Sequence, residues 1–349
     1  MGRDIAPQDE GYSMKLRTFI LLVASLWCFV GCSIIDDDLS VCGPDNTDYY
    51  LHYTMQLVTH MQTKVDDQLA PVGETALADT LKSWLAPVFS GVAHDLHMNF
   101  YATDEAGELK QNRSEIIDAS QKSYTLTIPR EDYMHLAIVN IQDNASIAMM
   151  GAQYAPSLRL TQVNGDTLRS HPTAVYTARL PMRMSDNIDQ SFHVDLYMVS
   201  CAVALVIDTP SFAMPPMKVL LSGTATGFNV RDSVFTYSKS LIRAEQVTNR
   251  CYAAVALPSP HGSDSTAMSP KKAKVADATL WQLRAYVTLP DGKITETILS
   301  IDTPLDAGAV EIIRVSLLAD GSIIPLGNPH VGASVTLDWK DGSSQNVDI

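Results

Sequence analysis

The residue types in this chain that could bind a metal or transfer protons lie closest together at His94-Asp95-Leu96-His97. Imidazole and carboxylate groups ligate divalent metals and exchange protons near neutral pH. The alternation that follows predicts a strand here, however, and residues three apart in a strand point to opposite faces of the sheet. His94 and His97 therefore cannot share one ion. We predict ordinary histidines at the surface or at the start of a strand, and no metal site.

The other histidines and acidic pairs have structural interpretations. His52 and His60 lie on or just beyond a predicted strand, His135 lies between apolar neighbours, and Asp66-Asp67 fall in a polar segment. The chain lacks the GxSxG, GxxxxGK[ST], HExxH and EF-hand patterns of well-known catalytic and metal sites. We predict no catalytic residues, no cofactor and no enzymatic activity.

The N-terminal region has the features of a lipoprotein export signal. Lys15 and Arg17 follow Met14, and the apolar run Phe19–Val30 is shorter than the roughly 20 residues that span a bilayer. The run ends in Phe29-Val30-Gly31-Cys32, which resembles the lipobox of bacterial lipoproteins, with Phe29 in place of the usual Leu. We predict cleavage before Cys32 and attachment of lipid to its thiol, since several acyl chains give a stable anchor.

An acidic segment follows the predicted lipid. Asp36, Asp37 and Asp38 would be repelled by an anionic membrane surface, which would keep a tether extended. The same run resembles the surface-export signal of Bacteroidetes lipoproteins, and a plain solvated linker is the alternative. We therefore divide the start of the chain into an upstream extension and signal peptide, 1–31, and a lipidated acidic tether, 32–46.

Composition and charge narrow the class of protein. The 349 residues are 46% hydrophobic and 18% charged, with a formal net charge of −14. These values exclude a disordered chain, a coiled coil and a collagen-like fibre, and such an acidic chain lacks the cationic surface that nucleic acids require. Cys201 and Cys251 lie in apolar runs and are predicted to be small buried residues. A disulfide between two of Cys42, Cys201 and Cys251 stays open for an exported protein.

Apolar residues alternate with polar ones along most of the chain, which predicts strands with one buried face. These strands include Tyr49–Leu57, Leu96–Phe100, Tyr124–Ile128, Met134–Ile138, Val194–Met198, Trp281–Leu289 and Ile294–Ile301. Apolar residues at helical spacing predict one short helix over Glu74–Phe89, which Pro87 would end or bend.

Turn residues divide these strands into a tandem arrangement. Pro290-Asp-Gly-Lys293 predicts a tight hairpin, and Pro258–Lys274 predicts a long exposed loop. We place a domain boundary at the polar segment Ser185–Gln190, which gives an N-terminal domain over 47–186 and a C-terminal domain over 187–349. The predicted fold is mainly all-β: two antiparallel β-sandwich domains in tandem, with one short helix in the N-terminal domain.

Several segments together resemble the FimB-like and Mfa-type anchor subunits of Bacteroidales type V fimbriae. The likeness covers most of the chain after the signal and is strongest from Cys32 to about Asn144. It is carried by Cys32, Asp38–Cys42, Tyr50–Met55, Asp95–Tyr101 and Tyr133–Ala137. The resemblance implies transthyretin-like β-sandwiches, a lipid-anchored place on the cell outer membrane facing outward, and a role in tethering a fimbrial shaft and limiting its length. It implies shaft subunits and accessory fimbrial proteins as partners, and no enzymatic activity.

Fimbrial subunits of this type join when one donates a strand to a groove on its neighbour. An anchor cannot lose its N-terminal segment without losing its lipid, so we expect it to donate its C-terminal strand, with Val335, Leu337 and Trp339 entering pockets. The alternative is that this strand completes its own sandwich. A rival function is a surface glycan-binding lipoprotein, which would need exposed aromatic side chains, whereas Trp84, Trp281 and Trp339 all lie on apolar stripes typical of a core.

Overall fold

The computed structural model describes residues 46–56, 61–89, 95–103, 109–118, 123–129, 131–150, 157–160, 167–183, 190–208, 210–261, 279–327 and 330–339. By its backbone contacts the chain divides into one unit of residues 1–48 and 127–130 and a second of residues 49–126 and 131–349. The second unit holds the helices and the sites described below. Cys32, the run Asp36–Asp38, Cys42, His60, His94 and most of the loop Pro258–Lys274 lie outside the described residues.

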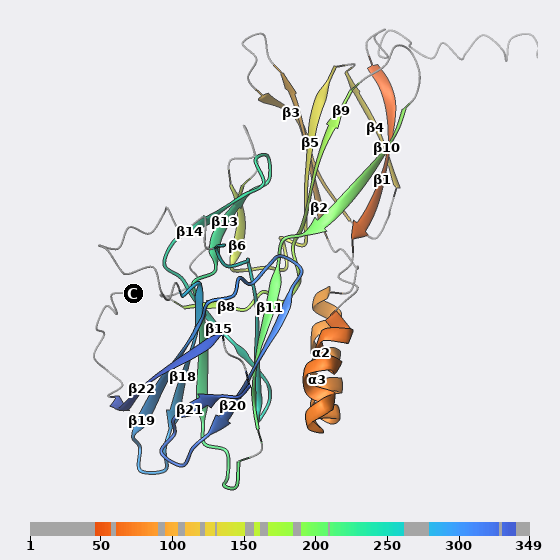
Figure 1. The fold of residues 1–349 in the computed structure, drawn as a ribbon. Coiled ribbons are helices and arrows are strands. Elements are labelled where there is room, and N and C mark those ends of the chain that lie inside the picture. Colours follow the sequence, from red (N-terminus) through yellow and green to blue (C-terminus); the bar gives the residue numbers. More distant parts are fainter. Residues whose placement is uncertain are drawn as a thin grey trace, which may run out of the picture. The chain divides into compact units, whose positions relative to one another are not determined.

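Four sheets make up the described fold, so the prediction of a mainly all-β protein is confirmed (Figure 1). The seven-stranded sheet has the order β3 (Leu109–Asp118), β2 (Asp95–Thr103), β5 (Tyr133–Val139), β9 (Tyr176–Met182), β10 (Gln190–Met198), β1 (Asn46–Gln56), β4 (Ser123–Pro129). The four-stranded sheet has the order β14 (Val234–Tyr237), β13 (Ala225–Asn229), β7 (Ser157–Leu160), β6 (Ile147–Met150).

The other two sheets are built mostly from the second half of the chain. The six-stranded sheet has the order β22 (Val331–Trp339), β19 (Ile294–Ile301), β18 (Trp281–Thr288), β12 (Met217–Ser222), β15 (Leu241–Arg243), β8 (Thr167–Arg169). The five-stranded sheet has the order β16 (Glu245–Thr248), β17 (Cys251–Ala256), β11 (Cys201–Ile207), β20 (Val310–Leu317), β21 (Ile323–Pro325).

Strand pairing departs from the purely antiparallel scheme that the sequence predicts. Most neighbours are antiparallel, but β1 with β10, β11 with β20, and β8 with β15 are parallel. Parallel neighbours need long crossover connections, which alternation within a strand does not encode. Two of these pairs join strands from either side of residue 187: β10 pairs with β1 of the first half, and β8 pairs with β15 of the second half. The division into domains over 47–186 and 187–349 stays a prediction.

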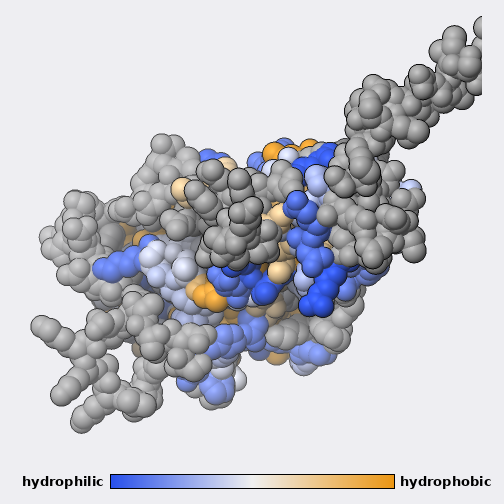
Figure 2. Space-filling model, turned by 90° about the horizontal axis from the view of Figure 1, so that it is seen from above, coloured by the Kyte–Doolittle hydropathy of each residue, from blue (hydrophilic) through white to orange (hydrophobic). Residues whose placement is uncertain are grey.

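The five- and six-stranded sheets enclose one hydrophobic core. Alternate residues of β11, such as Cys201 and Val203, face this core together with Trp281 and Leu299. Both Cys201 and Cys251 are buried, as predicted, and both are free thiols, which decides the disulfide question that the sequence left open for these two residues. A second core lies between the seven- and four-stranded sheets and includes Phe228. Figure 2 shows a face on which the described residues are mostly hydrophilic and the hydrophobic ones form separate spots.

Two helices precede β2. The predicted helix is confirmed as α3 (Thr75–Phe89), and it ends two residues beyond Pro87. Helix α2 (Met61–Leu69) was not predicted, and a 3-10 turn over Ala70–Val72 joins it to α3. Because α2 contacts β20 and α3 contacts β16, the pair lies over the face of the five-stranded sheet that points away from its core. Ala202 and Ala204 are buried on that face, where their small side chains permit close packing. No helix in the described part is long and apolar enough to cross a membrane.

The predicted strands and hairpin are recovered at nearly the predicted positions. Strands β18 and β19 pair from Trp281 with Ile301 to Thr288 with Ile294. Gly292 takes a φ of 82° in the turn, and its N–H donates to the Leu289 carbonyl over 2.9 Å. Glycine is favoured there because a side chain would strain the left-handed backbone.

Candidate interaction site at the C-terminal strand

Strand β22 lies at one edge of the six-stranded sheet, and among the described strands it pairs only with β19. The antiparallel register runs from Val331 opposite Ile301 to Trp339 opposite Ile294, with an irregularity between Ile294 and Glu296. An edge strand has backbone N–H and C=O groups along its outer side that a further strand can bind. The C-terminal strand of this chain is therefore placed to extend its sheet.

The middle of β22 is exposed on both faces. Val331 is buried, whereas every residue over 332–336 is exposed, and Val335 keeps 41% of its surface accessible. Successive strand residues point to opposite faces, so neither face is covered over this stretch. The neighbouring edge strand of the facing sheet, β21, is only three residues long, and its Ile324 is also 46% exposed. The edge formed by β22 and β21 is therefore apolar and partly exposed.

The first seven residues of β22 lack the charges and prolines that usually protect an edge strand, and Asp338 and an irregular register follow only near the end of the strand. The segment Val331–Leu337 reads Val-Gly-Ala-Ser-Val-Thr-Leu and contains neither charge nor proline. Charged side chains, prolines and bulges are the usual means by which natural sheets prevent unwanted pairing. The edge strand β3, by contrast, carries Lys110, Arg113 and Glu115, and β16 begins with Glu245. We take β22 as the candidate site for pairing with another chain.

The residues predicted as strand donors lie on this strand. Val335 is paired opposite Thr297, and the backbone of Leu337 and Trp339 belongs to β22, although the placement of those two side chains lies outside the description. In this structure the strand is part of its own sheet. Donation of the strand to a neighbour stays a prediction.

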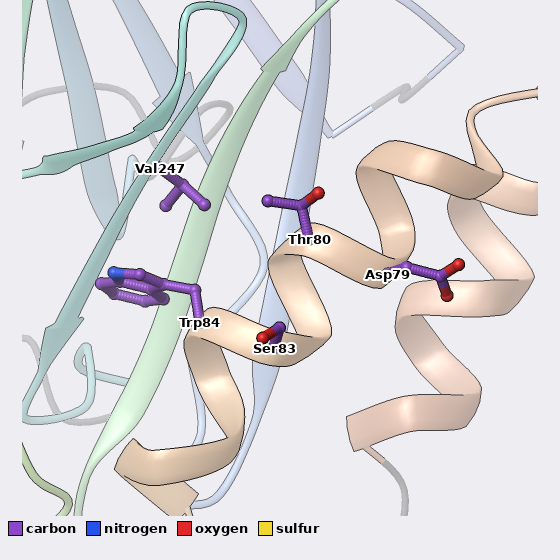
Figure 3. A pocket seen from close by; sticks show the side chains of 5 residues that line it. All are labelled: Asp79, Thr80, Ser83, Trp84 and Val247. Atoms are coloured by element: carbon purple, nitrogen blue, oxygen red, sulfur yellow. The ribbon is translucent and has the colours of Figure 1, made fainter.

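The sequence predicts that Trp84, Trp281 and Trp339 lie in cores, but the structure does not place all of them there. Trp281 is buried, and its Nε1 donates to the Thr303 carbonyl over 2.8 Å. Trp84 is only half-buried and lines an open pocket with Asp79, Thr80, Ser83 and Val247 (Figure 3). The prediction was wrong for Trp84 because helical spacing places it at the margin of the apolar stripe of α3, and the sheet does not extend far enough to cover that margin.

The described histidines have structural roles. His97 Nε2 lies 2.9 Å from Asp95 Oδ2, and that carboxylate also accepts hydrogen bonds from the backbone N–H groups of Ile141 and Gln142. Burial raises the pKa of Asp95, but these hydrogen bonds outweigh it, and the net pKa lies below the usual range. Among the described residues, no group of three or more His, Cys, Asp and Glu side chains could hold a metal.

His135 is fully buried against an aromatic ring. Its imidazole stacks on Phe100 with ring centroids 4.5 Å apart, and Nδ1 lies 3.2 Å from the Asn99 carbonyl. Burial lowers the pKa of His135 to about 4, so the ring is neutral at physiological pH. The predicted structural role of His135 is confirmed, and exposed His52 lies 2.8 Å from the Ser123 hydroxyl.

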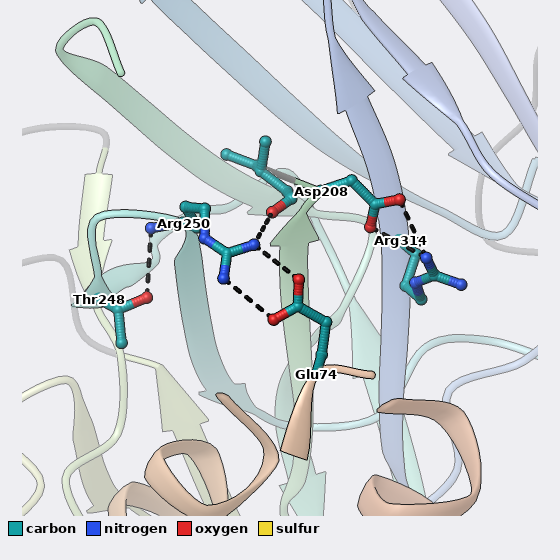
Figure 4. Close-up of polar contacts among 6 residues, drawn as sticks. Glu74, Asp208, Thr248, Arg250 and Arg314 are labelled. Atoms are coloured by element: carbon teal, nitrogen blue, oxygen red, sulfur yellow. Dashed lines mark hydrogen bonds and ion pairs between the residues drawn. The ribbon is translucent and has the colours of Figure 1, made fainter. Parts of the chain in front are cut away.

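An ion-pair cluster joins the start of α3 to the five-stranded sheet (Figure 4). The Arg250 guanidinium donates to both carboxylate oxygens of Glu74, over 2.8 and 3.0 Å, and also to the Ile207 carbonyl. Nearby, Arg314 donates to both oxygens of Asp208 over 3.0 Å. The hydrogen bonds from Arg250 hold the pKa of Glu74 below its usual range. Nothing in the local sequence predicts this cluster, because Glu74 and Arg250 are 176 positions apart.

Comparison with known proteins finds likeness in structure. No family model matches the chain, and no curated protein matches its sequence. The fimbrial anchor protein Mfa2 from Porphyromonas gingivalis is 13% identical over 84% of this chain and 99% of its own, with a TM-score of 0.43.

Two further solved structures are similar over comparable lengths. The tip fimbrial protein Mfa3 from the same organism, with a C-terminal truncation, is 11% identical over 84% of this chain and 100% of its own, with a TM-score of 0.42. A candidate polysaccharide-binding protein (DUF1812) from Bacteroides thetaiotaomicron is 9% identical over 82% and 97%, with a TM-score of 0.48. The solved structures similar to this chain thus include fimbrial components.

Proposed function

We propose that this protein is an outer-membrane lipoprotein that anchors a fimbrial shaft to the cell surface and limits its length. The observation that carries the proposal is the edge position of β22, which is uncharged over Val331–Leu337 and exposed on both faces over 332–336. Strand pairing of this kind gives affinity through backbone hydrogen bonds and register through alternating side chains. The partner is therefore a protein that contributes or accepts an extended strand.

The order of features along the chain supports an anchor. The predicted lipid on Cys32 and the tether with Asp36, Asp37 and Asp38 precede β1, and β22 is the last strand of the described fold. One end of the chain is then available for the membrane and the other for the shaft. In this proposal β22 is donated to a shaft subunit, and Val335, Leu337 and Trp339 enter the acceptor's pockets. Limitation of shaft length would follow from the single junction that each anchor provides.

The shaft contact is tested with a charge on the exposed edge. We expect Val335→Lys to weaken attachment of fimbriae, because the acceptor would have to desolvate an ammonium group. Val234→Lys is the matched control, since Val234 is an exposed valine of strand β14 with 53% of its surface accessible. The readouts are the fraction of fimbriae retained on cells and their length. Equal retention in both variants would refute the role of β22, and so would normal fimbriae in cells that lack Val335–Ile349.

The membrane anchor is tested separately at Cys32. We expect Cys32→Ala to yield soluble protein and to release fimbriae into the medium, because the thiol needed for lipid attachment is gone. Mass spectrometry of the wild-type protein should find acyl chains on Cys32. An unmodified, freely diffusing wild-type chain would exclude the anchor role even if β22 binds a fimbrial subunit.

A further inference from the structure

An open pocket lies between helix α3 and the edge strand β16. It has a volume of about 510 Å³ and is lined by Asp79, Thr80, Ser83, Trp84 and Val247 (Figure 3). The Trp84 indole and Val247 lie at one end of the pocket, Thr80 and Ser83 lie between the indole and Asp79, and the Asp79 carboxylate points away from the indole (Figure 3). The pocket therefore has an aromatic, apolar end and a polar end.

This combination of side chains suits a sugar ring. A pyranose has an apolar face of C–H groups, which can stack on an indole, and a rim of hydroxyls, which need donors and acceptors. The Ser83 hydroxyl can act as both, the Thr80 hydroxyl can accept because it already donates to the Ala76 carbonyl over 2.9 Å, and the Asp79 carboxylate accepts. Trp84 is half-buried, so part of its ring stays accessible while the rest is held in place.

The helix that carries these groups is held firmly. Leu81 and Leu85 are almost fully buried, and Lys82 forms ion pairs with Asp66 of α2 over 2.7 Å and with Asp79 over 2.9 Å. The pair with Lys82 uses Oδ1 of Asp79, and a carboxylate has acceptor capacity for further donors. A ligand would therefore meet side chains whose positions are already set, which lowers the entropic cost of binding.

The charges favour a neutral ligand. The described lining contains Asp79 and no cationic side chain that could pair with a phosphate, sulfate or uronate group, and nearby Lys82 is shared between Asp66 and Asp79. The whole chain carries a formal charge of −14, which repels polyanions. A neutral hexose or pentose unit fits the lining better than an acidic sugar does.

We infer that the pocket formed by Asp79, Thr80, Ser83, Trp84 and Val247 binds one sugar unit of a neutral glycan, stacked on Trp84. The inference is independent of the fimbrial role, because it uses α3 and β16 and no part of β22. A single aromatic stacking contact gives weak binding, with a dissociation constant on the order of 1 mM.

The test is titration of the full chain in detergent with neutral gluco-, manno- and xylo-oligosaccharides of about six units, followed by calorimetry and tryptophan fluorescence. We expect binding of at least one of these and a loss of about tenfold or more for Trp84→Ala, as for aromatic residues at the centre of other binding sites. Trp84→Phe should lose less, and Ser83→Ala should weaken binding several-fold. Tyr197→Ala is the matched control, because Tyr197 is an aromatic residue of β10 that is 59% exposed.

The outcomes separate the alternatives. Binding that is lost in Trp84→Ala and kept in Tyr197→Ala supports the inference. Equal binding by Trp84→Ala and wild type would overturn it, as would binding of polygalacturonate alone or of none of the neutral oligosaccharides. Circular dichroism and thermal unfolding of Trp84→Ala establish that lost binding is not lost folding, and the Trp84→Phe variant provides a second reading at the same position.

Discussion

The ion pair between Glu74 and Arg250 should be one of the main contacts that stabilise the packing of α2 and α3 on the five-stranded sheet. The side chains of Arg250 and Glu74 keep only 21% and 19% of their surface, and two hydrogen bonds join them. Exposed pairs contribute roughly 0–1 kcal/mol, and breaking a fully buried pair costs about 3–5 kcal/mol. For this intermediate burial we expect Glu74→Ala and Arg250→Ala each to lower the free energy of unfolding by about 2 kcal/mol.

A double-mutant cycle tests that value. The pair of substitutions together should cost little more than either alone, which gives a coupling energy of about 1–2 kcal/mol from urea unfolding at pH 7. Hydrogen exchange of the first amides of α3 should accelerate in both single variants. Lys293→Ala is the control, because Lys293 lies 3.4 Å from Asp291 and is 57% exposed, so its loss should cost no more than about 0.5 kcal/mol.

The pH dependence of the coupling follows from the lowered pKa of Glu74. Because the pKa of Glu74 in the folded state lies below its ordinary value of 4.5, the carboxylate contributes stability above pH 4.5, and this contribution is lost as the pH falls through the folded-state pKa. The coupling energy should therefore be constant from pH 8 to 6 and vanish in acid. Strictly additive costs at pH 7, with a coupling below about 0.3 kcal/mol, would refute the assignment.

Three further predictions concern the cores and turns. Gly223→Ala should lower the free energy of unfolding by more than about 1 kcal/mol, because φ is +83° and the new Cβ would lie 2.8 Å from the backbone of a neighbouring strand. Gly292 has a similar φ of +82° but has no atom within 4 Å of the position that an added Cβ would take, so Gly292→Ala should cost less. Thermal unfolding of the two variants compares these costs. Leu81→Ala, at 0% exposure, should cost about 2–5 kcal/mol in urea unfolding, and a cost below about 1 kcal/mol would show that α3 does not pack as described. Burial lowers the pKa of His135 and His171 to about 4, so the unfolded chain binds more protons than the folded chain below pH 6.5. The free energy of unfolding should therefore fall from pH 6.5 to 4. His135→Phe should make that fall smaller.

The strands and the main helix were predictable because their signals are local. Alternation over Trp281–Leu289 and Ile294–Ile301 requires only that one face meets a core, and Asp291-Gly292 is a sufficient turn signal between them. Helix α2 was missed because it is short and polar, although Met61, Val65 and Leu69 recur at helical spacing and were the available signal.

The candidate site at β22 also has features that the sequence predicts and features that only the structure shows. Absence of charge over Val331–Leu337 can be read directly from the sequence, but an edge position becomes known only when the order of strands in the sheet is known. The half-exposed state of Trp84 also depends on where the five-stranded sheet ends, and helical periodicity alone placed it with the core.

The sequence by itself determined that segments such as Trp281–Leu289 and Ile294–Ile301 form strands and which of their faces are apolar, because these properties repeat every second residue within one segment. Tertiary structure decided which strands become neighbours, brought Glu74 to Arg250, and left Trp84 at an open pocket. Those outcomes depend on the relative free energies of contacts between residues far apart in the chain, and no local pattern carries that information.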